Sequence, residues 1–91
     1  MARVVVTLRV MPESPSTNLA ALQKAAEKEV AAYGGVVGKC EIEPIAFGLK
    51  ALKVFFVMDE AKGATDPLEK KIGAITGVES VSVDDVRRAI G

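Results

Sequence analysis

The side chains that most often carry out catalysis are scarce in this 91-residue chain. Histidine is absent, and Cys40 is the only cysteine. These absences exclude Ser-His and Cys-His nucleophilic pairs, an internal disulfide, thiolate metal clusters and most zinc sites. The sequence therefore predicts no catalytic residue, no metal site and no cofactor, and it favours a protein that is not itself an enzyme.

Two pairs of neighbouring carboxylates, Asp59 with Glu60 and Asp84 with Asp85, are the acidic groups that could hold a cation or act as acid and base. Sequence neighbours in a loop rarely converge on one point. Loops that bind hard cations also supply more oxygen ligands at regular spacing. We therefore expect these four side chains to be solvated charges or helix caps.

Gly34, Gly35 and Gly38, in the segment YGGVVGKC, have a spacing that could suit a phosphate-cradling loop. They follow a predicted helix instead of opening one, so no helix N-terminus would face the anion. We expect these glycines to end the helix. Cys40 falls on the predicted buried side of the next strand and is expected to be an inert core residue.

Phe47 is unusual in the segment PIAFGLKALK, residues 44–53, because a turn punctuated by Pro44 and Gly48 needs no aromatic residue at its tip. The ring either packs back onto its own hairpin or is exposed as an anchor for a partner. Arg87 and Arg88 present a similar choice near the end of the chain. They lie either in a mobile segment that reaches into another protein or in a frayed, solubilising tail.

The charge balance and hydropathy narrow the function classes further. Twelve basic residues balance twelve acidic ones, so the chain lacks the net positive charge that non-specific nucleic-acid binding normally requires. The longest apolar run is too short to cross a membrane, and the N-terminus lacks the pattern of a signal peptide. We expect a cytoplasmic protein that contacts neither a membrane nor nucleic acid directly.

The first half of the chain predicts a strand, a helix and a second strand. Residues 3–10 place apolar side chains at alternate positions, as in a half-buried strand. Thr17 or Asn18 can cap a helix that begins near Leu19. Residues 36–45 alternate more weakly and predict a second strand.

The second half of the chain also predicts a strand, a helix and a strand. Residues 51–58 alternate strongly and predict a third strand that forms a hairpin with the second. Asp66 is expected to cap a second helix, with Pro67 at its first position. Residues 78–83 predict a fourth strand, and residues 84–91 are expected to be a charged tail that forms a turn of helix or frays.

The resulting order, β-α-β-β-α-β, predicts a ferredoxin-like α+β sandwich over residues 1–91, a four-stranded antiparallel sheet with both helices on one face. The open face would carry Val5, Thr7, Phe55 and Val57 together with Arg3, Arg9, Lys53, Glu41, Glu43 and Asp84. RNA-recognition domains stack bases on this face, so a single-stranded RNA-binding module is one alternative function. A small-molecule-sensing regulatory domain is another, because this fold hosts many activities.

Three collinear segments, PIAFGLKALKV, GATDPLEKKI and GVESVSVDDV, resemble the translation elongation factor 1-beta family, specifically its free-standing archaeal form. The resemblance covers essentially the whole chain. It implies a single guanine-nucleotide exchange domain, residues 1–91, with a ferredoxin-like fold and no bond chemistry of its own. The implied partner is elongation factor 1-alpha, a GTPase that brings its own nucleotide and magnesium.

The resemblance also implies the partner-binding residues. In eukaryotic relatives the aromatic residue of a glycine-flanked corner contacts the GTPase, and Phe47 with Gly48 occupies that position here. Those relatives end with a lysine that reaches the magnesium and phosphate site of the GTPase, and the matching position is Arg88, followed by three more residues. The implied mechanism is disturbance of that site, which releases GDP. The implied set is Phe47, Gly48, Lys50, Lys53, Arg87 and Arg88.

Overall fold

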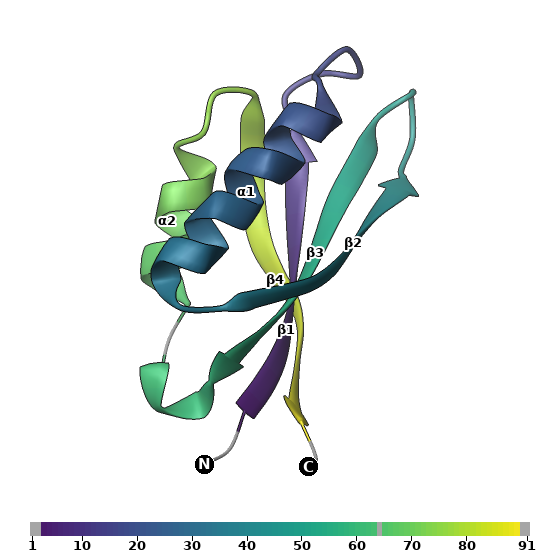
Figure 1. Ribbon diagram of the computed structural model, residues 1–91. Coiled ribbons are helices and arrows are strands. Elements are labelled where there is room, and N and C mark those ends of the chain that lie inside the picture. The colour runs from purple at the N-terminus through teal and green to yellow at the C-terminus, as the bar shows by residue number, and fades with distance from the viewer. Residues whose placement is uncertain (1–2, 64, 90–91) are drawn as a thin grey trace.

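In the computed structural model, which describes residues 3–63 and 65–89, two helices pack on one face of a four-stranded antiparallel sheet (Figure 1). The spatial order of the strands is β2-β3-β1-β4. This is the ferredoxin-like α+β arrangement that the sequence predicted. The elements are β1 (Arg3–Pro12), α1 (Leu19–Tyr33), β2 (Val36–Pro44), β3 (Lys50–Asp59), the short 3-10 helix η1 (Glu60–Lys62), α2 (Asp66–Gly73) and β4 (Val78–Ala89).

Aliphatic side chains between the sheet and the helices form the core. Alternation turns every second residue of β1 and β3 toward the helices, and residues spaced by four on α1 and α2 meet them. Phe56 is the largest fully buried side chain. The buried core comprises Val6, Leu8, Val10, Leu22, Ala26, Val30, Leu52, Val54, Phe56, Met58, Leu68, Ile72 and Val78.

Helix α1 begins and ends where the sequence predicted. Asn18, one of the two predicted caps, accepts a hydrogen bond from the Ala21 amide through its side-chain oxygen. Gly34 ends the helix in the left-handed conformation, with φ of 105°. Gly35 lies so close to Phe56 that a Cβ there would be 3.0 Å from the ring. These glycines therefore end the helix and let the chain pass closely over the core.

Helix α2 begins differently from the prediction. Its N-cap residue is Thr65, so the expectation that Asp66 caps the helix is wrong. Thr65 donates its hydroxyl hydrogen to Glu69, and Asp66 occupies the first helical turn. A carboxylate in the first turn stabilises a helix through the helix dipole whether or not it caps, and the amide that Pro67 lacks would have no helical partner there.

Strand β4 is longer than predicted and includes residues 84–89 of the expected loose tail, so that expectation is wrong for these residues; residues 90–91 lie outside the described part of the chain. It pairs with β1 through Arg87 opposite Val5 and Arg88 opposite Val4. The register shifts between Thr7 and Leu8, which leaves Asp84 as an extra residue in β4. Such a bulge breaks the alternation of side chains between faces, and this break hid the strand from sequence reasoning.

Candidate functional site

The turn between β2 and β3 holds Phe47 in a defined position. The amide of Leu49 donates to the carbonyl of Ala46, and the amide of Ile45 donates to the carbonyl of Leu49, both at 2.9 Å. Phe47 and Gly48 have φ angles of 54° and 79°. Positive φ at both central residues is typical of a type I′ hairpin turn, whose twist matches that of the strands. The turn therefore presents its tip on a fixed backbone.

The Phe47 side chain is 96% exposed. Of the two interpretations that the sequence left open, the structure supports the exposed ring and contradicts packing onto the hairpin. Phe47 is also the one described non-glycine residue with positive φ, a conformation that costs about 1 kcal/mol for an L residue. An exposed aromatic ring on a strained backbone contributes little to the fold, and this combination indicates a surface used for binding.

Lys53 is not available to a partner in the way that the sequence suggested. Its ammonium group lies 3.3 Å from Asp84 and 3.4 Å from Glu43, and its side chain is only 20% exposed. Hydrogen bonds to Asp84 and then to Glu43 raise the pKa of Lys53. Arg9 binds Glu43 as well and lies 4.0 Å from Asp84. These four residues, one from each strand, form an electrically neutral cluster on the open face.

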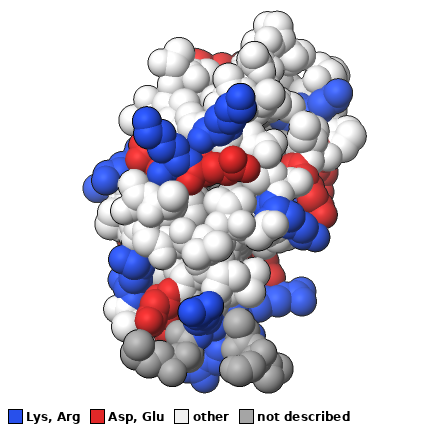
Figure 2. Space-filling view, viewed as in Figure 1, with Lys and Arg blue, Asp and Glu red and all other residues white. Residues whose placement is uncertain are grey.

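The middle of the open face therefore does not present the basic surround that RNA binding needs. Arg9 and Lys53 are neutralised within the cluster, and the bulge in β4 turns Asp84 toward them. Phe55, the aromatic residue of this face, is covered by the ammonium group of Lys39 at 4.7 Å from the ring centroid. On the helix side, basic and acidic side chains are interspersed (Figure 2). No observation on either side favours the RNA-binding alternative.

Arg87 and Arg88 lie on opposite faces of β4 and have separate partners. On the open face, Arg87 binds Asp85 at 2.7 Å. On the helix side, Arg88 donates two hydrogen bonds from Nη2 to both carboxylate oxygens of Glu60, at 2.7 and 3.0 Å. These hydrogen bonds raise the pKa of Arg88. Both guanidinium groups remain largely exposed, so a stronger anion can compete for them.

The turn between β2 and β3, which carries Phe47, and the C-terminal end of β4, which carries Arg88, lie at opposite ends of the sheet (Figure 1). The turn that holds Phe47 precedes Lys50, whereas Arg88 pairs with β1 near Arg3, which is opposite Asp59. Strand β3 runs between these two ends, and its length at about 3.3 Å per residue is about 30 Å. The molecule is 42 Å long in all. One small contact cannot include both residues.

One of the four adjacent carboxylates, Asp59, is a cap as predicted, and the other three form ion pairs that the sequence did not predict. Asp59 accepts from the Ala61 amide at the start of η1, and Glu60 binds Arg88. Within residues 3–63 and 65–89, no group of three or more potential ligands could hold a metal ion. The part of the chain that the structure describes also has no helix long and apolar enough to span a membrane.

Cys40 packs against the core from β2, as predicted, and donates a weak hydrogen bond to Glu27 at 3.5 Å. Burial, followed by the nearby Glu27 carboxylate, raises the pKa of the thiol from 9.0 to about 11. The folded state therefore favours the protonated thiol, and this stabilisation is complete below pH 9 and lost as the pH rises through about 11.

We expect the native protein to resist alkylation of Cys40 by iodoacetamide at pH 8. A pKa higher by about two units lowers the thiolate fraction about 100-fold, and only the thiolate reacts. The native protein and the same protein in urea are compared at one reagent concentration by mass spectrometry. Equal rates would show that the thiol is not shielded as the structure indicates.

The sequence pointed to Lys50 but not to its environment. Lys50 precedes Leu52 by two positions and shares its face, so its side chain belongs to the helix side, whereas Lys53 belongs to the open face. Lys50 also lines a cavity with Pro15 and Leu19, which sequence reasoning missed. Side chains alternate between the two faces along β3, so the odd spacing between Lys50 and Lys53 could have shown that they lie on opposite faces. Glu60 was missed as a partner of Arg88 because that contact depends on the unrecognised end of β4.

The chain is similar to known proteins over nearly its whole length. The family model described as "EF-1 guanine nucleotide exchange domain" matches residues 5–89. The Elongation factor 1-beta of Methanothermobacter thermautotrophicus is 44% identical over 88 residues, which cover 97% of this chain and 98% of that protein. The Elongation factor 1-beta of Methanococcoides burtonii is 39% identical over 90 residues, which cover 99% and 100%.

Two solved structures share the fold at low sequence identity. The C-terminal domain of the MgtC protein from Mycobacterium tuberculosis has a TM-score of 0.60 and 12% identity, and the match covers 98% of this chain and 88% of that one. BlrP1 BLUF has a TM-score of 0.56 and 15% identity, with coverage of 100% and 57%. These similarities show that the fold recurs among dissimilar sequences, and they carry no functional meaning here.

Proposed function

Since this chain belongs to the elongation factor 1-beta family, we propose that it promotes the exchange of GDP for GTP on elongation factor 1-alpha. In this proposal one exchange domain, residues 1–91, acts in the cytoplasm and does no bond chemistry. The nucleotide and the magnesium ion belong to the GTPase. The observation that best supports docking on a protein partner is the fully exposed ring of Phe47 on a fixed, strained turn.

Phe47 is proposed as the apolar anchor of the complex. Its backbone is fixed by the hydrogen bonds of the turn, with Gly48 supplying the second positive φ angle. Little conformational entropy is then lost when the ring enters a pocket of the partner. Exposed aromatic residues in such positions often dominate the free energy of binding. Lys50 is the neighbouring charge that stays available, whereas Lys53 supports the hairpin from within the sheet.

Arg88 is proposed to act at the other end of the sheet, with Arg87 as an accompanying docking contact. A separation of about 30 Å means that Phe47 and Arg88 meet two different regions of the GTPase. Exchange then follows from differential binding: the factor favours a GTPase conformation whose magnesium and phosphate site is disturbed, and GDP binds that conformation less tightly. To act there, Arg88 must exchange Glu60 for an anionic group of that site.

The test is release of a fluorescent GDP analogue from elongation factor 1-alpha of the same source. Excess unlabelled nucleotide prevents rebinding, and the protein is added in substoichiometric amounts. We expect faster release with turnover, meaning that each molecule of the factor serves many molecules of GTPase. Unchanged release from a partner that binds nucleotide normally would reject the proposed function.

Replacing Arg88 with alanine is expected to slow GDP release roughly tenfold, while the dissociation constant of the complex changes less than threefold. The reason is that a group acting on the nucleotide site mainly changes how strongly the bound factor weakens GDP binding, and contributes less to docking. Such coupling between two ligands of one protein typically changes affinity 5- to 150-fold. Exchange rates and dissociation constants are measured on the same samples.

The matched control for Arg88 is Arg3→Ala, which removes another exposed arginine from the same end of the sheet. This control is expected to leave both quantities close to those of the unchanged protein. If Arg88→Ala weakens binding and exchange by equal factors, Arg88 is a docking residue only.

A further inference from the structure

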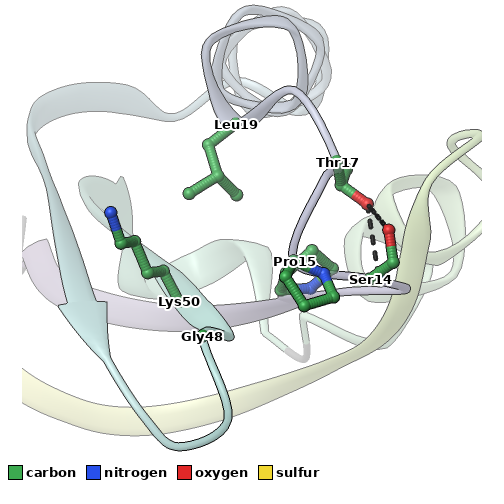
Figure 3. A pocket seen from close by; sticks show the side chains of 7 residues that line it. Ser14, Pro15, Thr17, Leu19, Gly48 and Lys50 are labelled. Carbon is green, nitrogen blue, oxygen red and sulfur yellow. Dashed lines mark hydrogen bonds between the residues drawn. The ribbon is translucent and has the colours of Figure 1, made fainter.

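A cavity of about 250 Å³ lies beside the β2-β3 turn, between the start of α1 and the loop that follows β1. Its walls come from the loop, from the start of α1 and from the turn (Figure 3). The apolar walls are Pro12, Pro15 and Leu19, and the polar ones are Ser14, Thr17 and Lys50, with Gly48 at the turn. Two prolines and a leucine form part of the wall, but the wall that the cavity exposes is more polar than apolar.

The loop that forms one wall is held in place by its own hydrogen bonds. The amide of Thr17 donates to the carbonyl of Ser14, and the amide of Ser14 donates to the Thr17 hydroxyl, both at 3.2 Å. Pro15 occupies the second position of this turn, where its fixed φ angle is favourable. The cavity is therefore preformed, and filling it requires little ordering of the chain.

The volume decides what kind of group fits. Sites for small ligands and cofactors usually enclose about 300–1,000 Å³. A cavity of about 250 Å³ lies below that range but is ample for a single side chain. This comparison favours a side chain of another protein over a small regulatory molecule, and it argues against the ligand-sensing alternative.

The charge at the edge is positive and unpaired. No residue within the described ranges forms an ion pair with Lys50, in contrast to Lys53. The Lys50 side chain is exposed and extends along the cavity opposite Leu19 (Figure 3). A carboxylate arriving with the occupant would meet this ammonium group without displacing an existing partner, so none of its binding free energy is lost to breaking an ion pair.

The cavity is also continuous with the turn that presents Phe47. Gly48 follows Phe47 directly and lines the cavity, and Pro15 lies 3.7 Å from the place where a Cβ on Gly48 would be. The cavity therefore opens directly beside the turn on which a partner would contact Phe47.

We propose that this cavity receives one acidic side chain of elongation factor 1-alpha, an aspartate or glutamate whose carboxylate pairs with Lys50. The contact is reciprocal, because Phe47 enters the partner while the partner enters the cavity beside it. This inference rests on the proposed exchange function, and it adds a second binding site to the docking surface.

The first test reverses the charge at the edge. Lys50→Glu is expected to raise the dissociation constant of the complex at least tenfold, since attraction becomes repulsion, and to leave the melting temperature unchanged. The control is Lys28→Glu, the same reversal at an exposed position on α1. An effect of Lys50→Glu no larger than that of Lys28→Glu would overturn the charge pairing.

The second test fills the cavity from inside. Leu19→Trp extends an apolar side chain into the space, and Leu19→Met is the control that keeps a similar volume. We expect the tryptophan variant to fold, as circular dichroism will check, and to bind at least fivefold more weakly than the methionine variant. Equal affinities of the two folded variants would overturn the proposal that the partner fills this cavity.

A carbodiimide cross-link tests the proposal without any variant, so the folding of the variants does not affect the result. In the complex with the unchanged protein, the Lys50 amine is expected to couple to an aspartate or glutamate of the GTPase, identified by mass spectrometry of the joined peptides. If GDP release is accelerated but no such peptide forms, the exchange function stands and the cavity proposal fails. If release is not accelerated at all, the proposed function itself fails.

Discussion

Replacing Phe47 with glycine is expected to raise the free energy of unfolding by up to about 1 kcal/mol and to weaken binding to elongation factor 1-alpha by about 2 kcal/mol. The gain in stability arises because glycine adopts a φ of 54° without the steric cost that phenylalanine carries. The loss in affinity, about thirtyfold, is that of a typical interface anchor. Opposite changes from one substitution would indicate a residue selected for binding at the expense of the fold.

Phe47→Ala separates the two effects. Alanine removes the ring but keeps the strained backbone, so we expect the same loss of affinity with almost no change in stability, because the ring is 96% exposed. Dissociation constants come from calorimetric titration and stabilities from urea denaturation. If both variants bind as tightly as the unchanged protein, Phe47 is not an anchor.

The fold was predictable from the sequence because most of its elements satisfy several local rules at once. Helix α1 has a cap at Asn18, an apolar stripe and a glycine stop, and β3 alternates along most of its length. For α2, where the local rules allowed more than one residue to fill the same role, the predicted residue was wrong. A helix start rich in Thr65, Asp66 and Pro67 permits more than one capping residue, and only the packed structure selects among them.

The end of β4 shows a different kind of failure. Its alternation is interrupted at Asp84, and the following residues are charged, so they resemble a tail when taken alone. What makes them a strand is β1, a long neighbour whose backbone groups on that side pair with those of β4. Long-range pairing of this kind is invisible to any local pattern. The same limit hid the contact between Arg88 and Glu60.

For the candidate site, the sequence indicated the residues but not their spatial relations. Phe47 was noticed because its type does not suit a turn, yet exposure of its ring is a property of the folded hairpin. Lys50 and Lys53 appeared equivalent, although Lys50 lies beside a cavity without an ion-pair partner among the described residues and Lys53 is bound within the sheet. Charge and spacing alone cannot distinguish a lysine that serves a partner from one that joins strands.

The largest loss of stability is expected from Phe56→Ala. Phe56 is fully buried between β3 and α1, so its removal leaves a cavity and should lower the free energy of unfolding by about 4 kcal/mol. That is a large fraction of the 5–15 kcal/mol typical of small domains, and it corresponds to a fall of roughly 20 °C in melting temperature. Denaturation followed by circular dichroism measures both quantities.

The neighbouring Phe55 is the matched control, because it has the same side chain on the opposite face of β3. It is only half-buried and contacts Lys39, so Phe55→Ala should cost about 1 kcal/mol. A difference of about 3 kcal/mol between adjacent phenylalanines would measure how strongly the sheet distinguishes its two faces. Equal losses would mean that β3 is not paired in this register. The turn that carries Phe47 would then lie elsewhere as well, since that register sets the position of the turn.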